Sequence, residues 1–200
     1  LTVVVTDGIS TGMYSREAAR GAADRALDEL TRTDRPDRGV EQAHHDAAAR
    51  AASWVAGQAM PGQVFPPGAT YLAVRLAPAA GGASHQVTTA HLGDTRAYLL
   101  PADPATEPLA ITTDHRGPTG ELTASLDGNP RIPPVVSHTE LSRSHPRLLV
   151  VTDGLGRLVA PGDLSGLPAD PVRALSQLVG TREGTAPDDI TAVVIGPIRP

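Results

Sequence analysis

The segments LTVVVTDGIS (Leu1–Ser10) and RLLVVTDGLG (Arg147–Gly156) each end an apolar run with Thr-Asp-Gly. Short runs that are rich in β-branched residues and closed by glycine predict strands buried on both faces. An aspartate at the end of such a strand would be held by rigid backbone at the edge of a sheet. The glycine lets the chain turn away and leaves its carbonyl open to a ligand. The two corners, at Asp7 and Asp153, could therefore share a cation.

The composition predicts a single domain over residues 1–200 with an aliphatic core, because hydrophobic residues make up 40% and aromatic residues only 2%. A formal charge of −5 gives no general attraction to nucleic acid or to an anionic membrane, so we expect neither partner. The absence of cysteine excludes disulfides and thiolate metal sites. No apolar run approaches the roughly 18 residues of a membrane span, and no signal-like segment opens the chain. We expect a cytoplasmic protein.

The hydrophobic pattern predicts a layered α+β fold, with helices packed on sheets. We expect helices over Ser15–Leu30, Val40–Met60 and Asp170–Leu178. In the first, Ser15 would be the N-cap and Leu27 would join four alanines at helical spacing. In the second, Trp54 would be the one large anchor. The strands are expected in ATYLAVRLA, HQVTTAHLGDTRAYLLP, EPLAITTD, VVSHTEL, RLLVVT and DITAVVIGPI, with a hairpin turn at Gly93-Asp94.

Acidic residues at strand ends are the candidate metal ligands. Mg²⁺ and Mn²⁺ prefer oxygen ligands, and carboxylates gathered from separate strand ends would supply them. Aspartate also caps turns and helices through hydrogen bonds to nearby backbone, which is the better interpretation for any one of these residues alone. The residues concerned are Asp7, Asp94, Asp153 and the pair Asp188-Asp189.

Six motifs change that interpretation when they are taken in order. They are VVVTDG, GAT (Gly68–Thr70), HLGDTRAYLL, LAITTDH (Leu109–His115), LLVVTDGL and PDDITAVVI. Together they resemble the metal-dependent protein phosphatase family, the type 2C (PPM-type) Ser/Thr phosphatases, over nearly the whole chain. The resemblance implies a four-layer α/β/β/α sandwich of two mainly antiparallel sheets flanked by helices, with two Mg²⁺ or Mn²⁺ ions at one end.

The resemblance also implies roles for individual residues. Asp7 matches the aspartate that bridges the two metal ions, and Gly8 matches the glycine whose carbonyl binds the second ion. Asp153 and Asp188 match the other carboxylates of the first metal site. Asp94 matches an aspartate of a third, weaker site, although we interpret it as structural. The implied reaction is attack of a metal-activated water on phosphorus, so no protein nucleophile is needed.

The sequence departs from the family pattern in four places. The usual Asp-Gly-x-Gly-Gly is replaced by DGIST, residues 7–11. The chain begins at Leu1, after the point where the family has a strand with a further acidic ligand and a phosphate-binding arginine, so we expect that segment to be missing. Arg157 replaces an aspartate near the third site and would repel a cation there. Only 37 residues separate His115 from Asp153, which predicts that most of the helical flap is absent and the cleft is open.

Three functions stay open at this point. The first is a Mg²⁺- or Mn²⁺-dependent phosphatase in signalling, acting on a phosphorylated protein that is the target of a Ser/Thr kinase. The second is a pseudophosphatase, a binding module with an incomplete metal centre, and the third is a hydrolase of a small phosphate ester. His115 is interpreted as structural, like Asp94. The other histidines show no common ligand spacing and are expected in packing or on the surface: His44, His45, His85, His91, His138 and His145.

Overall fold

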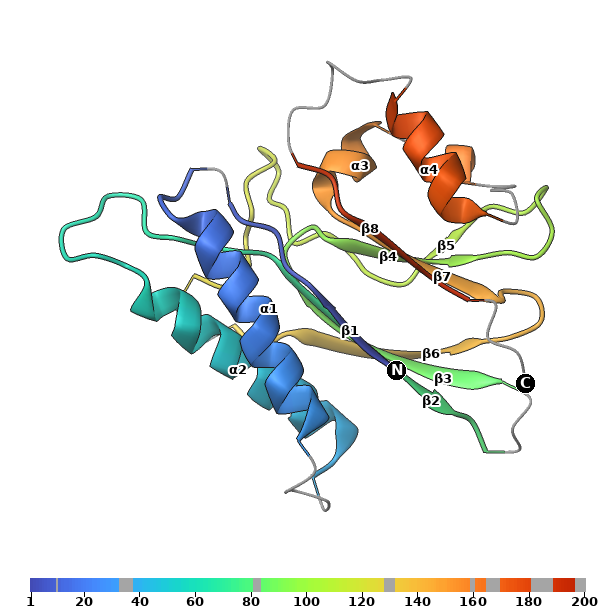
Figure 1. Cartoon of the computed structure of the whole chain (residues 1–200), viewed down its shortest axis with the longest axis horizontal. Helices are drawn as coiled ribbons and strands as arrows, with labels where there is room; N and C mark the ends of the chain where they lie inside the picture. Colours follow the sequence, from blue (N-terminus) through green and yellow to red (C-terminus); the bar gives the residue numbers. More distant parts are fainter. Residues whose placement is uncertain are drawn as a thin grey trace. The chain divides into compact units, whose positions relative to one another are not determined.

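The computed structural model describes residues 1–9, 11–32, 38–80, 84–127, 132–158, 161–164, 170–180 and 189–196 (Figure 1). The strands form two antiparallel four-stranded sheets, with orders β1-β2-β3-β6 and β5-β4-β7-β8. The predicted α+β class, two antiparallel sheets with helices, is confirmed.

The elements are β1 (Thr2–Val5), α1 (Ser15–Thr31), α2 (Val40–Gly57), β2 (Tyr71–Pro78), β3 (His85–Leu92), β4 (Arg96–Leu100), β5 (Leu109–Ala110), β6 (Val135–Leu141), β7 (Arg147–Val151), α3 (Asp153–Leu158), a 3-10 turn (Pro161–Leu164), α4 (Pro171–Gly180) and β8 (Ala192–Ile195).

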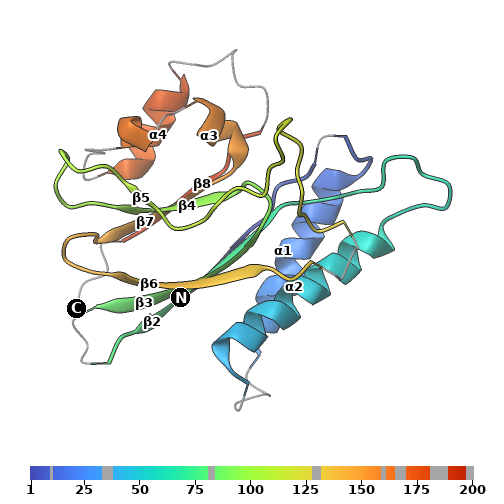
Figure 2. The same ribbon diagram turned by 180° about the vertical axis from the view of Figure 1, so that it is seen from behind.

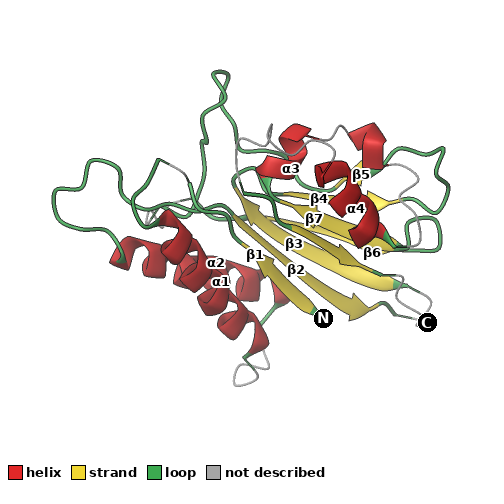
Figure 3. Cartoon of the chain, turned by 45° about the horizontal axis from the view of Figure 1, so that its top comes forward, coloured by secondary structure: helices red, strands yellow, loops and turns green. Residues whose placement is uncertain are grey.

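The chain divides into two compact units, each built around most of one sheet. The first unit comprises Leu1–Leu76, Thr88–Thr95 and Asp114–His138, and the second comprises the intervening and following residues. Figure 3 shows the strands that make up each sheet. Neither unit contains, among its described residues, a helix that is long and apolar enough to cross a lipid bilayer.

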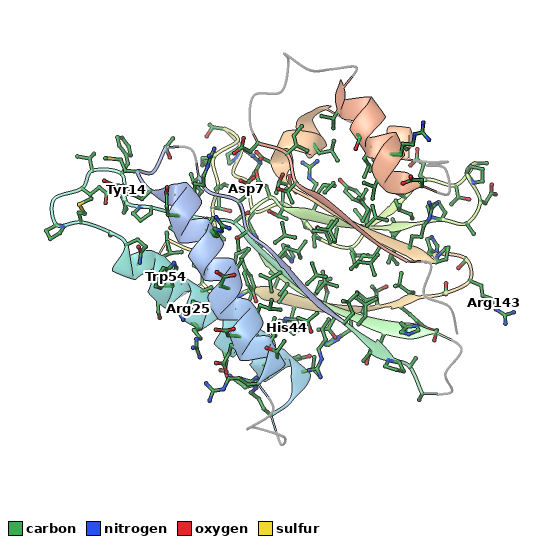
Figure 4. The ribbon with its side chains drawn as sticks, viewed as in Figure 1. Asp7, Tyr14, Arg25, His44, Trp54 and Arg143 are labelled. Atoms are coloured by element: carbon green, nitrogen blue, oxygen red, sulfur yellow. The ribbon has the colours of Figure 1, made fainter. Side chains whose placement is uncertain are left out.

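In the first unit, α1 and α2 lie side by side on one face of the β1-β2-β3-β6 sheet (Figures 1 and 2). Alanines from both helices fill this interface and pack against Tyr71, Ala73 and Leu92 of the sheet. Small side chains let the two helices approach closely. Gly21 makes room for Trp54, since a Cβ at this glycine would lie 2.1 Å from the indole nitrogen. Trp54 packs against the core as predicted, and the Arg25 guanidinium lies 4.9 Å from the centre of its ring (Figure 4).

A buried ion cluster joins the end of α1 to α2. Glu29 pairs with Arg38 and with Arg50, whose Nη1 lies 3.0 Å from the glutamate Oε2. Burial alone would raise the pKa of Glu29, but the hydrogen bonds from the two arginines hold this pKa below its ordinary value. Arg38 also contacts Asp46 of α2, so the cluster fixes the helix pair where the alanine interface ends.

The start of α1 differs from the prediction. Tyr14, in the left-handed conformation with φ 62°, precedes the helix and makes no side-chain capping bond. Ser15 is the first helical residue, and its hydroxyl accepts a hydrogen bond from Gly68 N at 3.4 Å instead of capping the helix. Leu27 is 39% exposed, and Leu30 takes the buried position on that face. Tertiary contact with the loop before β2 therefore overrides the local capping signal.

In the second unit, β7 lies between β4 and β8 and is buried from Leu148 onward. Its Leu149 and Val151 pack against Leu155 of α3 and Leu175 of α4. The prediction of a strand buried on both faces is right for β7 and wrong for β1. β1 is an edge strand paired only with β2, and its first three residues keep partial exposure.

The predicted hairpin at Gly93-Asp94 is wrong. β3 lies between β2 and β6, whereas β4 lies between β5 and β7, so the turn carries the chain from one sheet to the other. Gly93 has φ 102°, as a tight turn requires, but its N–H and carbonyl bond to His115 and not across a hairpin. The expected strand EPLAITTD is reduced to two residues, which pair with Tyr98 and Leu99 of β4.

His44 of α2 is fully buried, and neither of its ring nitrogens has a hydrogen-bond partner in the described structure. Burial lowers the pKa of His44 to about 4, and the nearby Arg75, His138 and His45 act in the same direction. The unfolded chain therefore binds a proton below pH 6.5 that the folded chain does not bind until about pH 4.

We predict that stability is lost as the pH falls from about 6.5 to 4, by about 3 kcal/mol in all from His44. Urea unfolding of the wild type and of His44→Leu across this range measures the contribution, because the variant should have a flatter pH profile. His85→Leu, at a partly exposed position, is the control and should keep the wild-type slope. Parallel profiles for the wild type and His44→Leu would contradict the prediction.

Candidate active site

The first Thr-Asp-Gly corner follows β1 in the first unit (Figure 4). Thr70 N donates to Asp7 O at 2.8 Å, and Ile9 N donates to Gly68 O at 2.9 Å. These bonds flank Gly8, which faces Ala69 in an isolated antiparallel bridge. Gly8 and Ala69 form a pair that is not directly hydrogen-bonded, because the two bonds lie on either side of it. In such an antiparallel pair each residue directs its own carbonyl away from the opposite segment, so Gly8 O points away from Ala69. A Cβ at Gly8 would lie 2.7 Å from the Ser15 carbonyl, so only glycine permits this approach of α1.

The hydroxyl of Thr70 ties this corner to the turn after β3. Its Oγ1 accepts a hydrogen bond from Asp7 N at 3.2 Å and lies 2.7 Å from the hydroxyl of Thr95. Both threonines are buried. Gly93 packs directly on Thr70, because a Cβ there would lie 2.8 Å from the threonine Cβ. The network brings Asp94, the neighbour of Thr95, into the same region of the first unit as Asp7.

His115 anchors the same turn. Its Nδ1 accepts a hydrogen bond from Gly93 N at 3.0 Å, and its backbone N donates to Gly93 O at 2.9 Å. The imidazole stacks on His91, with ring centroids 4.9 Å apart. His115 therefore has a structural role in holding the β3–β4 turn.

Asp94 is paired with a cation of the protein. Asp94 is buried, and its Oδ2 accepts a hydrogen bond from Nη2 of Arg116. Sequence reasoning missed Arg116, although an arginine directly after Asp-His was the available signal. The arginine named in the sequence analysis, Arg157, has a side chain outside the described part of the structure.

The second Thr-Asp-Gly corner lies in the second unit, where Asp153 is the first residue of α3 directly after β7 and Thr152. Thr152 N donates to Thr191 O at 3.0 Å, and Thr191 N donates to the Thr152 hydroxyl at 2.9 Å. A Cβ at Gly154 would lie 2.4 Å from the carbonyl oxygen of Asp189, so this glycine admits the chain segment before β8.

The atoms of the predicted metal ligands are of the chemical type that the expected ions bind. The carboxylates of Asp7 and Asp153 and the carbonyl of Gly8 are oxygen donors of the kind that Mg²⁺ and Mn²⁺ take. Within the residues that the structure describes, no three His, Asp or Glu side chains lie close enough together to hold a metal ion. Asp188 falls outside the described residues. The four ligands named from the sequence therefore stay a prediction.

No protein-family model and no curated protein sequence matches the chain. Solved structures do match it. A bacterial serine phosphatase aligns with a TM-score of 0.78 at 16% identity, covering 96% of this chain and 84% of that chain. Serine/threonine phosphatase Stp1 from Staphylococcus aureus gives 0.73 at 17% identity, covering 96% and 82%. PppA from Pseudomonas aeruginosa gives 0.69 at 25% identity, covering 96% and 84%.

The chain therefore has the fold of the PP2C-type serine/threonine phosphatases, as the motifs predicted. The sequence predicted that most of the helical flap between His115 and Asp153 is absent. Among the described residues from 116 to 152, the structure has a short hairpin, β6 and β7, and no helix.

We predict that Gly93→Ala destabilises the protein by at least about 1 kcal/mol more than Gly62→Ala. Both glycines have positive φ, 102° and 78°, so both substitutions strain the backbone. Only the methyl at residue 93 also collides with Thr70, since no heavy atom lies within 4 Å of the Cβ position at Gly62. Equal losses in urea unfolding would mean that the contact between the turn and Thr70 is looser than described.

Proposed function

We propose that this protein is a Mg²⁺- or Mn²⁺-dependent phosphatase that hydrolyses phosphoserine or phosphothreonine in proteins. The observation that supports the proposal most directly is the match of 96% of the chain to a bacterial serine phosphatase. The neighbours' names, serine phosphatase and serine/threonine phosphatase, suggest the substrate class. The substrate would be the product of a Ser/Thr kinase, and a cytoplasmic setting and a signalling role are parts of the same proposal.

We propose that Asp7, Gly8, Asp153 and Asp188 would hold Mg²⁺ or Mn²⁺ ions. The bonds from Thr70 to both the N–H and the carbonyl of Asp7 fix the backbone that carries this carboxylate. Asp153 is fixed by the bonds between Thr152 and Thr191. Rigid backbone at both corners suits ligands that must hold their geometry during a reaction. When bound, the ions would supply Lewis acidity and lower the pKa of a water molecule.

We predict that Asp153→Asn and Asp7→Asn each lower Mn²⁺-dependent phosphate release by at least about a hundredfold. Each change keeps the size of the side chain and removes one negative charge that would hold the cation. The assay is phosphate release from a phosphothreonine peptide. Asp24→Asn, on the exposed face of α1, removes the same charge away from the site and should retain wild-type turnover.

Full activity in Asp153→Asn would show that the ligand assignment is wrong. A wild-type protein without any metal-dependent turnover would favour the second candidate, a pseudophosphatase. The observation that favours this candidate is that the buried carboxylate of Asp94 is already paired with Arg116. A hydrolase of small esters would instead turn over a small aryl phosphate much faster than the phosphopeptide.

A further inference from the structure

Asp94 is a buried carboxylate that is paired with a positive charge. Its side chain is 3% exposed, and a carboxylate removed from water is stable only when it is paired or hydrogen-bonded. Its place in the β3–β4 turn is fixed by the neighbouring Thr95 and by the two bonds between Gly93 and His115. The backbone that carries this carboxylate is therefore held in place.

Arg116 is delivered to this carboxylate by a small hairpin. Thr123 N donates to His115 O at 2.9 Å, and residue 116 bridges to residue 122. Gly117 N donates to Glu121 O at 2.8 Å. At the tip, Gly120 has φ 88°, and its carbonyl accepts a hydrogen bond from Nη1 of Arg116. Nη1 of the guanidinium thus donates to the hairpin tip and Nη2 donates to Asp94. The backbone of the hairpin therefore helps to hold the guanidinium beside the carboxylate.

We infer that Arg116, through its pairing with Asp94, keeps a divalent cation off this carboxylate. The guanidinium brings its own positive charge to the carboxylate, so the pair needs no bound ion. A divalent ion would have to displace a tethered cation and leave Arg116, only 28% exposed, without its carboxylate. The inference rests on the proposed function only for the class of ion, Mg²⁺ or Mn²⁺.

The consequence is a difference in metal content. This chain would bind its ions at the two Thr-Asp-Gly corners and none on Asp94, where the Arg116 side chain takes the place of an ion. The charge at this turn would then be part of the folded protein and would remain when metal is removed.

The test compares the wild type with Asp94→Asn, Arg116→Gln and the double variant, using Mn²⁺ as the probe. Mn²⁺ bound per chain is counted by titration, and melting is followed with chelator and with millimolar Mn²⁺. Arg143→Gln is the control, because Arg143 is exposed in the β6–β7 turn (Figure 4). We expect Asp94→Asn to bind as many ions as the wild type, and Arg116→Gln to bind one more.

With chelator, Arg116→Gln should melt roughly 5–10 °C below the wild type, because it removes the positive charge that pairs with a buried carboxylate. Mn²⁺ should restore part of this loss. The double variant should lose both the extra ion and the extra response to Mn²⁺, and Arg143→Gln should behave as the wild type does.

A wild type that loses one bound ion on Asp94→Asn would overturn the inference. So would an Arg116→Gln variant that binds the wild-type number of ions with the wild-type response to Mn²⁺. If Arg116→Gln does not fold, Arg116→Lys keeps a cation and must also bind no additional ion. A wild type that binds no Mn²⁺ would contradict the proposed metal-dependent function. The inference would then be decided by whether Arg116→Gln binds one Mn²⁺ ion that the wild type does not bind.

Discussion

The hydroxyl of Thr70 joins the two chain segments on which the first half of the candidate site depends. It accepts a hydrogen bond from the backbone of Asp7 and contacts the hydroxyl of Thr95, beside Asp94. Because both hydroxyls are buried, water cannot replace either bond, and breaking one would leave a polar group unsatisfied. The absence of a side chain at Gly93 permits this contact. The predicted ligands are therefore held by backbone and short side chains, which leaves them little freedom.

The threonine and the glycine make comparable contacts in the two Thr-Asp-Gly corners. The hydroxyl of Thr6 donates to Ala19 O at 2.8 Å, and that of Thr152 accepts from Thr191 N at 2.9 Å, so each threonine bonds to the backbone of a neighbouring segment. Gly8 and Gly154 each admit backbone within 3 Å of their missing Cβ. Threonine and glycine thus fix the backbone on either side of the aspartate in each corner.

The sequence was most informative where structure depends on local pattern. Helical spacing and the apolar run before Thr152 predicted α1, α2 and β7 close to their observed bounds. The false hairpin at Gly93 arose because the choice of sheet partner is not local: β3 and β4 adjoin in sequence but pair with other strands. Arg116 was missed for the same reason, since its partner Asp94 lies 22 residues earlier. Asp7 and Asp153 were proposed as ligands from the motif, and this stays a prediction, because a motif does not show which side chains converge in the fold.

We propose one account of metal use, in which ions bind at the Thr-Asp-Gly corners and an arginine takes the place of an ion at the β3–β4 turn. The most direct test is a crystal structure of the wild type soaked in Mn²⁺, in which the ions and their ligands are counted. The account predicts ions bound by Asp7, Gly8 and Asp153, with Arg116 still paired to Asp94. An Asp7 carboxylate without an ion, or an ion on Asp94 with Arg116 displaced, would contradict it.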